Sequence, residues 1–202
     1  MTTALRKFFR KLLYGEPIVV VSGLPRSGTS MTMKMLDAAG IDIMTDELRT
    51  ADEDNPKGYF ELERVKDLEN ETDKSYLREA RGKAIKVISF LLKELPSDNN
   101  YKVLFMNRNL DEVLASQAKM LSRREETSDT DDKQMKEIWE NHLWKVKYQL
   151  KHQTHFEALE LRYKDMIERP GEQAMRIATF LGGLDAEKMA GVVDEQLYLN
   201  RR

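Results

Sequence analysis

The stretch GLPRSGTS, residues 23–30, constrains the fold of this chain more than any other segment. It follows the apolar run Ile18–Val21 and precedes residues with helical spacing, so it predicts a loop that joins a strand to a helix. Gly23 and Gly28 permit a tight turn that directs backbone N–H groups toward an anion at the helix N-terminus. The sequence therefore predicts a phosphate-binding loop. The alternative is an ordinary strand-to-helix turn with a solvent-facing Arg26.

The loop lacks the lysine found in ATP- and GTP-hydrolysing proteins. Their pattern is GxxxxGK[ST], in which the lysine reaches the terminal phosphates and the next hydroxyl binds Mg²⁺. Here Gly28 is followed by Thr29 and Ser30, and no later strand ends in an evident pair of acidic ligands. Arg26 instead places a cation within the loop, where it can neutralise charge on a leaving phosphate. A nucleoside triphosphate is therefore not the expected ligand, although a kinase with a divergent phosphate loop is an alternative function.

Four short segments carry strand patterns, and the stretches between them have apolar residues three and four positions apart. The strand segments are residues 18–22, 84–89, 101–107 and 158–162. Strands that alternate with helices predict an α/β fold with a parallel sheet covered on both faces. At 202 residues, we expect one domain spanning residues 1–202.

Composition narrows the function classes. Lys and Arg total 33 against 35 for Asp and Glu, a net charge of -2, so a general nucleic-acid-binding surface is not expected. The chain has no cysteine and three scattered histidines, which argues against metal catalysis at a site held by protein ligands. No apolar run approaches the ~20 residues that span a bilayer, and we expect a soluble, cytoplasmic protein.

The first sixteen residues predict an amphipathic basic helix. One side carries apolar residues and the other basic residues, namely Leu5, Phe8, Phe9, Leu12 and Leu13 against Arg6, Lys7, Arg10 and Lys11. Charge interrupts the apolar residues too often for a signal peptide. Such a helix packs on its own domain or on a second subunit of a homo-oligomer, or it contacts a membrane surface through residues 5–13.

Two polar segments interrupt the α/β pattern. Residues 42–61 form a polar loop that regains apolar character at Tyr59 and Phe60. Residues 122–136 are almost wholly charged or small and polar, which predicts a flexible lid loop or simply a solvated charge run.

A second anion site is predicted at residues 101–121. An apolar strand is followed by Arg108 and then by a helix that contains Ser116. Ligands of open α/β sheets bind beyond the carboxyl ends of the strands, which places Arg108 on the same edge as the phosphate loop. An arginine and a hydroxyl suit a second phosphate of the same nucleotide. Arg108 could instead form a salt bridge with Asp111 or Glu112.

These motifs together resemble a known enzyme family. GLPRSGTS looks like the 5′-phosphosulfate loop of sulfotransferases, and RNLDEVLAS looks like their 3′-phosphate motif. AIKVIS resembles their lysine-bearing strand, and ALELRYKDMIERPGEQAMRIATFLGG resembles a later segment of the family. The likenesses fall in order from about residue 17 to 183, so the chain is similar to a small bacterial-type sulfotransferase that uses 3′-phosphoadenosine 5′-phosphosulfate (PAPS).

The resemblance implies a P-loop-like three-layer sandwich and a role for each matching residue. Lys86 would contact the sulfuryl group, although a lysine there could also extend to solvent from an edge strand. Tyr163 would lie against the adenine, although it could be a core tyrosine. The 5′-phosphate would be held by Arg26, Ser27, Gly28, Thr29 and Ser30, and the 3′-phosphate by Arg108 and Ser116. In this family the transfer needs no metal.

The resemblance also indicates candidates for the general base. Cytosolic small-molecule members use a histidine two residues after the strand lysine, where this chain has Ile88. Other branches use a glutamate soon after the phosphate loop, which matches Glu61, with Asp54 as the second candidate. Glu61 could instead be the first-turn acid of a helix. The acceptor can be a small molecule, a lipid or a glycan, and a non-catalytic nucleotide-binding module is a further alternative.

Overall fold

The computed structural model describes residues 3–46, 60–123 and 131–194. Its central sheet has four parallel strands in the order β2-β1-β3-β4. They are β1 (Ile18–Gly23), β2 (Ala84–Lys86), β3 (Tyr101–Asn107) and β4 (Phe156–Arg162). The four predicted strands are confirmed, but β2 stops three residues earlier than predicted because Ser89 already begins the 3-10 helix η2. β4 starts two residues earlier, at Phe156.

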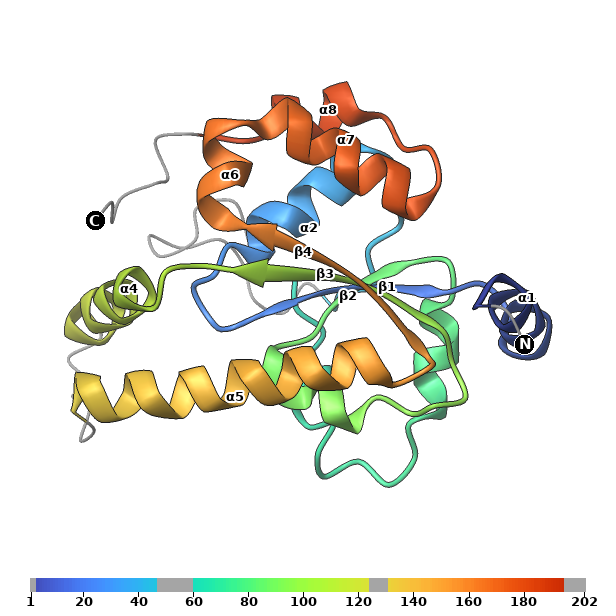
Figure 1. Cartoon of the computed structure of the whole chain (residues 1–202), viewed down its shortest axis with the longest axis horizontal. Coiled ribbons are helices and arrows are strands. Elements are labelled where there is room, and N and C mark those ends of the chain that lie inside the picture. Colours follow the sequence, from blue (N-terminus) through green and yellow to red (C-terminus); the bar gives the residue numbers. More distant parts are fainter. Residues whose placement is uncertain (1–2, 47–59, 124–130, 195–202) are drawn as a thin grey trace.

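Helices cover both faces of the sheet, so the predicted three-layer α/β fold is confirmed (Figure 1). One face carries α2 (Thr29–Ala38), α6 (Tyr163–Glu168), α7 (Pro170–Leu181) and α8 (Ala186–Gly191). The other carries η1 (Ser75–Ala80), η2 (Ser89–Glu94) and α5 (Asp132–His152). The short α3 (Glu63–Lys66) and α4 (Leu110–Arg123) lie toward the carboxyl ends of the strands, and α1 (Thr3–Tyr14) lies near the start of β1.

The alternation of side chains along β1 explains why both faces are covered. Val19 and Val21 join the apolar cluster under α2, whereas Ile18 and Val20 join the cluster under η1 and α5. All six residues of β1 are buried. A parallel strand that is apolar on both sides is stable only between two helical layers, since each buried aliphatic side chain contributes about 1.5–3 kcal/mol.

Several element ends follow from the sequence. Gly40 and Gly182 follow α2 and α7 and have φ values of 83° and 108°. Helices often end at a residue in this left-handed conformation, which glycine adopts most easily. The predicted lid loop at residues 122–136 needs correction at both ends, since α4 runs to Arg123 and α5 begins at Asp132. Residues 124–130 lie outside the described part of the chain.

The predicted N-terminal helix is confirmed as α1. In the portion of the chain that the structure describes, no helix combines the length and the apolar character needed to cross a membrane.

Candidate functional site

The predicted phosphate loop connects β1 to α2 at the carboxyl edge of the sheet. Gly28 precedes α2 with φ 99°, and Arg26 also has a positive φ of 66°. A non-glycine residue in this left-handed region costs about 1–3 kcal/mol and persists only where its surroundings fix it. Both donors of Ser27 are directed to the carbonyl of Leu24, with Oγ at 2.6 Å and N at 3.2 Å. Ser27 therefore shapes the loop from within.

The two glycines of the loop are required by close approach. A Cβ on Gly23 would lie 2.7 Å from the carbonyl oxygen of Met106, and one on Gly28 would lie 2.4 Å from the ring of Tyr163. Tyr163 is the first residue of α6 and directly follows β4. The ring of Tyr163 thus packs on the loop. This contact holds the end of β4 next to the end of β1.

The two predicted anion motifs meet in one group of side chains. Arg26 Nε donates to Ser116 Oγ at 3.1 Å, and Arg108 Nη1 donates to the carbonyl of Arg26 at 3.0 Å. The guanidinium of Arg108 also stacks on Tyr163, 4.2 Å from the ring centroid. Residues that follow β1, β3 and β4 in the chain are therefore in direct contact. We call Arg26, Arg108, Glu112, Ser116 and Tyr163 the arginine cluster.

Arg108 has the salt bridge that the sequence left as an alternative. Its Nε lies 3.0 Å from a carboxylate oxygen of Glu112, one helical turn later, and the two side chains are 7% and 5% exposed. The contact with Arg26 exists alongside this pair, so the salt bridge orients Arg108 without removing it from the edge of the sheet. Burial raises the pKa of Tyr163, while the nearby Arg108 opposes that shift. Tyr163 is therefore a neutral ring at physiological pH.

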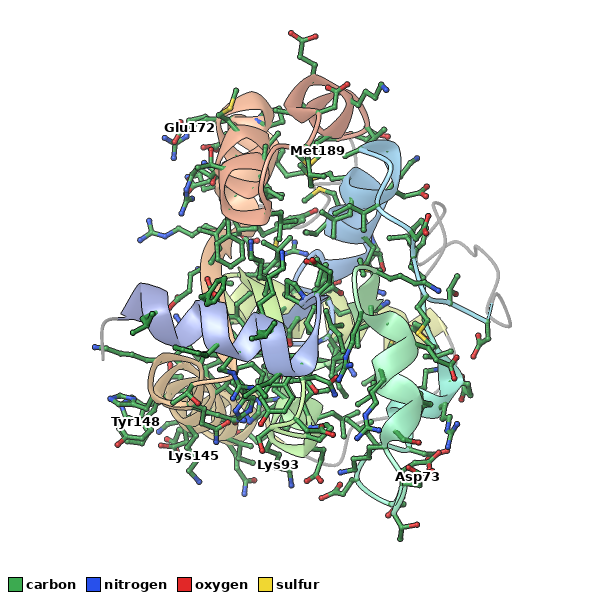
Figure 2. The ribbon with its side chains drawn as sticks, turned by 90° about the vertical axis from the view of Figure 1, so that its right-hand side faces the viewer. Asp73, Lys93, Lys145, Tyr148, Glu172 and Met189 are labelled. Atoms are coloured by element: carbon green, nitrogen blue, oxygen red, sulfur yellow. The ribbon has the colours of Figure 1, made fainter. Side chains whose placement is uncertain are left out.

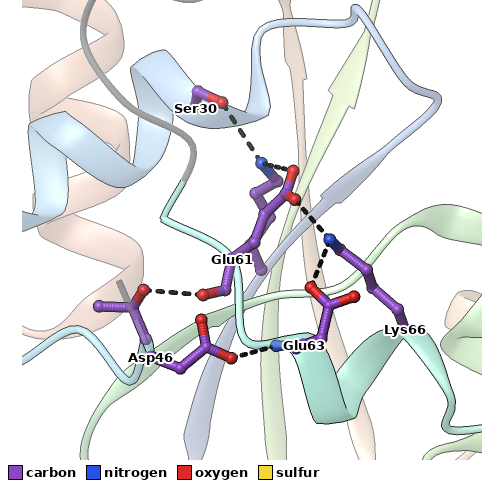
Figure 3. A network of polar contacts seen from close by, with 7 residues as sticks. Ser30, Asp46, Glu61, Glu63 and Lys66 are labelled. Carbon is purple, nitrogen blue, oxygen red and sulfur yellow. Dashed lines mark hydrogen bonds and ion pairs between the residues drawn. The ribbon is translucent and has the colours of Figure 1, made fainter. Parts of the chain in front are cut away.

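A second group of charged side chains lies beside the start of α2 (Figure 3). Lys86 Nζ lies 3.0 Å from Glu61 Oε1 and 3.4 Å from the hydroxyl of Ser30. The other carboxylate oxygen of Glu61 lies 3.0 Å from Lys66. The side chains of Lys86 and Glu61 are 8% and 16% exposed. We call Ser30, Glu61, Lys66 and Lys86 the lysine cluster.

The backbone around Glu61 is held by the segment that leaves α2. Thr45 Oγ1 donates to the carbonyl of Glu61 at 2.7 Å, and the N–H of Glu63 donates to the carboxylate of Asp46. Phe60 has a φ of 50°, so the residue before Glu61 is also in the left-handed region. These contacts direct the Glu61 carboxylate toward Lys86, and Glu61 precedes α3 rather than lying in its first turn.

Glu61 is ionised in this environment. Burial by itself would raise the pKa of its carboxyl, but attraction and hydrogen bonding from Lys86 and Lys66 outweigh burial, so its pKa lies below the ordinary value. A carboxylate in this state accepts a proton poorly as long as both lysines stay beside it. Asp54, the other predicted base, lies outside the described residues.

The position that a histidine base would take in the resemblance is occupied by an isoleucine. Ile88 is 39% exposed and follows β2 at the position where the resemblance would have a histidine. His142 is half-buried in α5. Its ring stacks on Phe90, and its Nε2 lies 2.8 Å from Ser89 Oγ. Burial, with a contribution from Lys145, lowers the pKa of His142.

The arrangement is suited to binding anions. The arginine cluster and the lysine cluster flank the same helix start, since Ser30 lies in the first turn of α2 and Gly28 packs on Tyr163. Backbone N–H groups at a helix start and fixed cations are the usual partners of phosphate and sulfate groups. Within the described ranges, no group of three or more His, Asp or Glu side chains could hold a metal ion.

Two contributors to the site were absent from the sequence expectations. Lys66 pairs with Glu61. It lies five residues later in the chain, and no sequence motif pointed to it. The support of Glu61 by Thr45 and Asp46 depends on contacts between segments about sixteen residues apart, for which no local pattern exists.

Comparisons with known proteins agree with the arrangement. The model of the sulfotransferase domain family matches residues 16–200. Similar solved structures include the sulfotransferase domain of the Synechococcus PCC 7002 olefin synthase, 17% identical with a TM-score of 0.56, covering 92% of this chain and 81% of that one. Among curated proteins, the sequence has no match.

Two further solved structures have a similar fold. The sulfotransferase domain from the curacin biosynthetic pathway is 13% identical, with a TM-score of 0.51 and coverage of 86% of this chain and 76% of that one. Retinol dehydratase in complex with androsterone and the inactive cofactor PAP is 19% identical, with a TM-score of 0.50 and coverage of 93% and 67%.

Proposed function

The chain belongs to the sulfotransferase domain family, and on that premise we propose that it transfers a sulfuryl group from PAPS to a hydroxyl or amine of an acceptor. The observation that carries this proposal is the direct contact between the two anion motifs. Arg26 reaches Ser116, and Arg108 reaches the backbone of Arg26. One nucleotide with phosphates at two positions explains why two such motifs share one edge of the sheet.

The residues fit such a donor chemically. Met106 and Tyr163 leave no room for a side chain at Gly23 or Gly28, so the backbone of the loop stays uncovered for an anion. The start of α2 supplies N–H groups. We assign the 5′-phosphate to Arg26, Gly28, Thr29 and Ser30. Ser27 is reassigned to the shape of the loop, because its hydroxyl and N–H both bond to Leu24.

The 3′-phosphate is assigned to Arg108 and Ser116. Glu112 accepts from Nε of Arg108, and the carbonyl of Arg26 accepts from Nη1. The five N–H donors of a guanidinium allow Arg108 to bind a phosphate as well. Tyr163 packs against both Gly28 and Arg108 and offers a flat apolar surface for the adenine.

Lys86 and Glu61 are proposed to act at the transferring group. The donor supplies a sulfuryl group whose bond to the 5′-phosphate oxygen breaks as a new bond forms to the acceptor oxygen or nitrogen, which gives up its proton. Lys86, with Arg26, offsets the negative charge that grows on the leaving oxygen, an effect worth about 10²–10³ in rate for one well-placed donor. Glu61 receives the proton of the acceptor.

Because Lys86 contacts Glu61, binding of the donor beside Lys86 should change the basicity of Glu61. An anion beside Lys86 competes with Glu61 for the same cation. Loss of that attraction raises the pKa of the carboxylate, because Lys86 lowers this pKa more than Lys66 does. Glu61 is thereby a weak base in the empty site and a stronger one when the donor is bound.

Calorimetry with two nucleotides tests the proposal. We expect saturable binding of adenosine 3′,5′-bisphosphate and weaker binding of adenosine 5′-monophosphate. Replacing Arg108 should weaken the bisphosphate about 10–100-fold and the monophosphate far less, since a hydrogen bond to a charged group contributes about 1.5–3 kcal/mol. The double variant Arg108→Met/Glu112→Gln avoids leaving a buried Glu112 carboxylate without its cation, and Arg78→Ala is the control for an exposed arginine elsewhere.

Equal losses for both nucleotides would contradict the assignment of Arg108. Folded protein that binds neither nucleotide would overturn the donor assignment, and Mg²⁺-dependent consumption of ATP would favour the kinase alternative. Binding without transfer of labelled sulfate to any acceptor of a broad panel would favour a nucleotide-binding module.

A further inference from the structure

Helix α1 presents its apolar side to solvent. The five apolar residues of this side are between 45% and 73% exposed: Leu5, Phe8, Phe9, Leu12 and Leu13. They recur three and four positions apart, so they form one stripe along the helix. The apolar side of α1 is therefore not packed on the described part of its own domain.

The domain holds α1 by its opposite side. Arg10 donates to the side chain of Asn100 at 2.9 Å and to the carbonyls of Ser97 and Asn99 at 2.8 and 2.9 Å. Asn100 returns a hydrogen bond to the carbonyl of Arg10 at 3.0 Å. Leu12 follows Arg10 by two residues, which is a rotation of about 200° around the helix. Fixing Arg10 inward therefore turns the apolar stripe outward.

The end of α1 is fixed as well. The guanidinium of Arg10 stacks on Tyr14, 4.7 Å from the ring centroid, and Asn100 also donates to the carbonyl of Gly15 at 3.3 Å. Figure 2, which faces the end of the molecule where α1 lies, shows this helix across the front with no other ribbon before it. The stripe is thus a rigidly presented outer surface of the described molecule.

The charge of α1 indicates what would cover the stripe. Its sequence TALRKFFRKLLY contains four basic residues and no acidic residue, in a chain whose net charge is -2. A second copy packed stripe to stripe would bring two such basic helices together, which electrostatic repulsion disfavours. An anionic lipid surface accepts the apolar side chains and attracts the positive charge of the helix, to which Lys11 contributes as a side chain that is 61% exposed and pairs with Glu16 at 2.8 Å.

We propose that α1 docks the protein on anionic membrane surfaces. The helix lies along the interface with Phe8, Leu12 and Leu13 inserted, and the domain stays outside the bilayer. Because Arg10 contacts the residues just before β3, α1 sits at the amino edge of the sheet, whereas the candidate site is at the carboxyl edge (Figure 1). The docked protein therefore keeps its candidate site turned away from the lipid, and nucleotide binding is independent of docking.

Vesicle sedimentation tests the proposal with the full chain. We expect the protein to sediment with vesicles of phosphatidylglycerol and phosphatidylcholine, to release at high salt, and to stay in solution with phosphatidylcholine alone. Leu12→Glu should weaken binding by at least about tenfold, since an inserted leucine contributes about 1.5–3 kcal/mol. Trp144→Glu is the matched control, because Trp144 on α5 is 68% exposed yet lies on another helix.

The outcomes separate the occupants of the stripe. Equal loss of binding in Leu12→Glu and Trp144→Glu, or no sedimentation of the wild type with anionic vesicles, would overturn the proposal. A dimer in light scattering that Leu12→Glu dissociates, without vesicle binding, would show that a second copy covers α1. Calorimetry with adenosine 3′,5′-bisphosphate should give the same affinity for wild type and Leu12→Glu, so failure of docking is distinguishable from failure of the proposed function.

Discussion

The arginine cluster and the lysine cluster flank one helix start but are held in different ways. The arginine cluster combines the buried Arg108–Glu112 pair with close packing, since the ring of Tyr163 occupies the space that a side chain on Gly28 would need and Arg26 adopts a positive φ. The lysine cluster depends on charge, since Glu61 lies between Lys86 and Lys66. Packing fixes positions regardless of pH, whereas charge pairs respond to pH and to a competing anion.

The difference suits the two tasks that we propose. A nucleotide must be bound in one orientation, and a packed, buried set of residues provides that. A proton must be taken from an acceptor, and a carboxylate whose pKa depends on its neighbours can change its basicity during the reaction. The following predictions separate the two kinds of support.

Gly28→Ala should give the largest loss of stability. The new Cβ would meet Tyr163 at 2.4 Å and the residue would keep φ 99°. We expect a loss of roughly 2–5 kcal/mol of unfolding free energy, from about 1–2 kcal/mol for a left-handed alanine and about 1–3 kcal/mol for overpacking. Chemical denaturation measures the loss.

Gly40→Ala is the matched control for backbone strain. Gly40 has φ 83°, but a Cβ there meets nothing within 4 Å. It should therefore cost only about 1–2 kcal/mol. Equal losses in the two variants would mean that contact with Tyr163 does not support the loop.

The lysine cluster should respond to loss of charge. Glu61→Gln leaves the buried Lys86 without its carboxylate and should cost roughly 1–3 kcal/mol. Lys86→Met should cost less, because Glu61 keeps Lys66. Denaturation of both single variants and of the double variant gives the coupling energy, which we expect to be favourable. Additive losses would contradict the pairing.

The pH dependence of the unfolding free energy should reflect the ionisation of Glu61. The pKa of Glu61 is lower in the folded protein than its ordinary value of 4.5. Its contribution is therefore complete above that value and is lost as pH falls through the folded pKa. The stability difference between wild type and Glu61→Gln should shrink below pH 4.5 and stay constant above it up to neutral pH. A difference that grows on acidification would have the wrong sign.

Ser22→Ala should have the smallest effect. Within the described residues, Ser22 Oγ is buried at the end of β1 without a hydrogen-bond partner. Removing an unsatisfied buried hydroxyl is nearly neutral or stabilising, so unfolding free energy should stay the same or rise by up to about 1 kcal/mol. A clear loss in thermal denaturation would indicate a partner such as a bound water.

Much of the site followed from local patterns, with limits that have physical causes. The strand-loop-helix pattern of residues 18–30 and the apolar run within residues 101–107 depend on neighbours in sequence. The early end of β2 did not follow, because AIKVIS reads as a strand throughout. Only packing against the rest of the fold decides that Ser89 begins η2. The helical start of α5 within residues 132–136 was missed because its sequence is almost wholly polar.

The sequence by itself determined a parallel α/β sheet with a glycine-containing loop between its first strand and the following helix, because glycine placement and apolar periodicity act over a few residues. The tertiary structure decided which side chains meet. Arg26 and Ser116 are ninety residues apart, and Lys86 and Glu61 belong to a strand and to the segment before α3. It also turned the apolar side of α1 outward, through contacts of Arg10 with a turn that precedes β3. Such contacts depend on how strands align in the sheet, which no local pattern specifies.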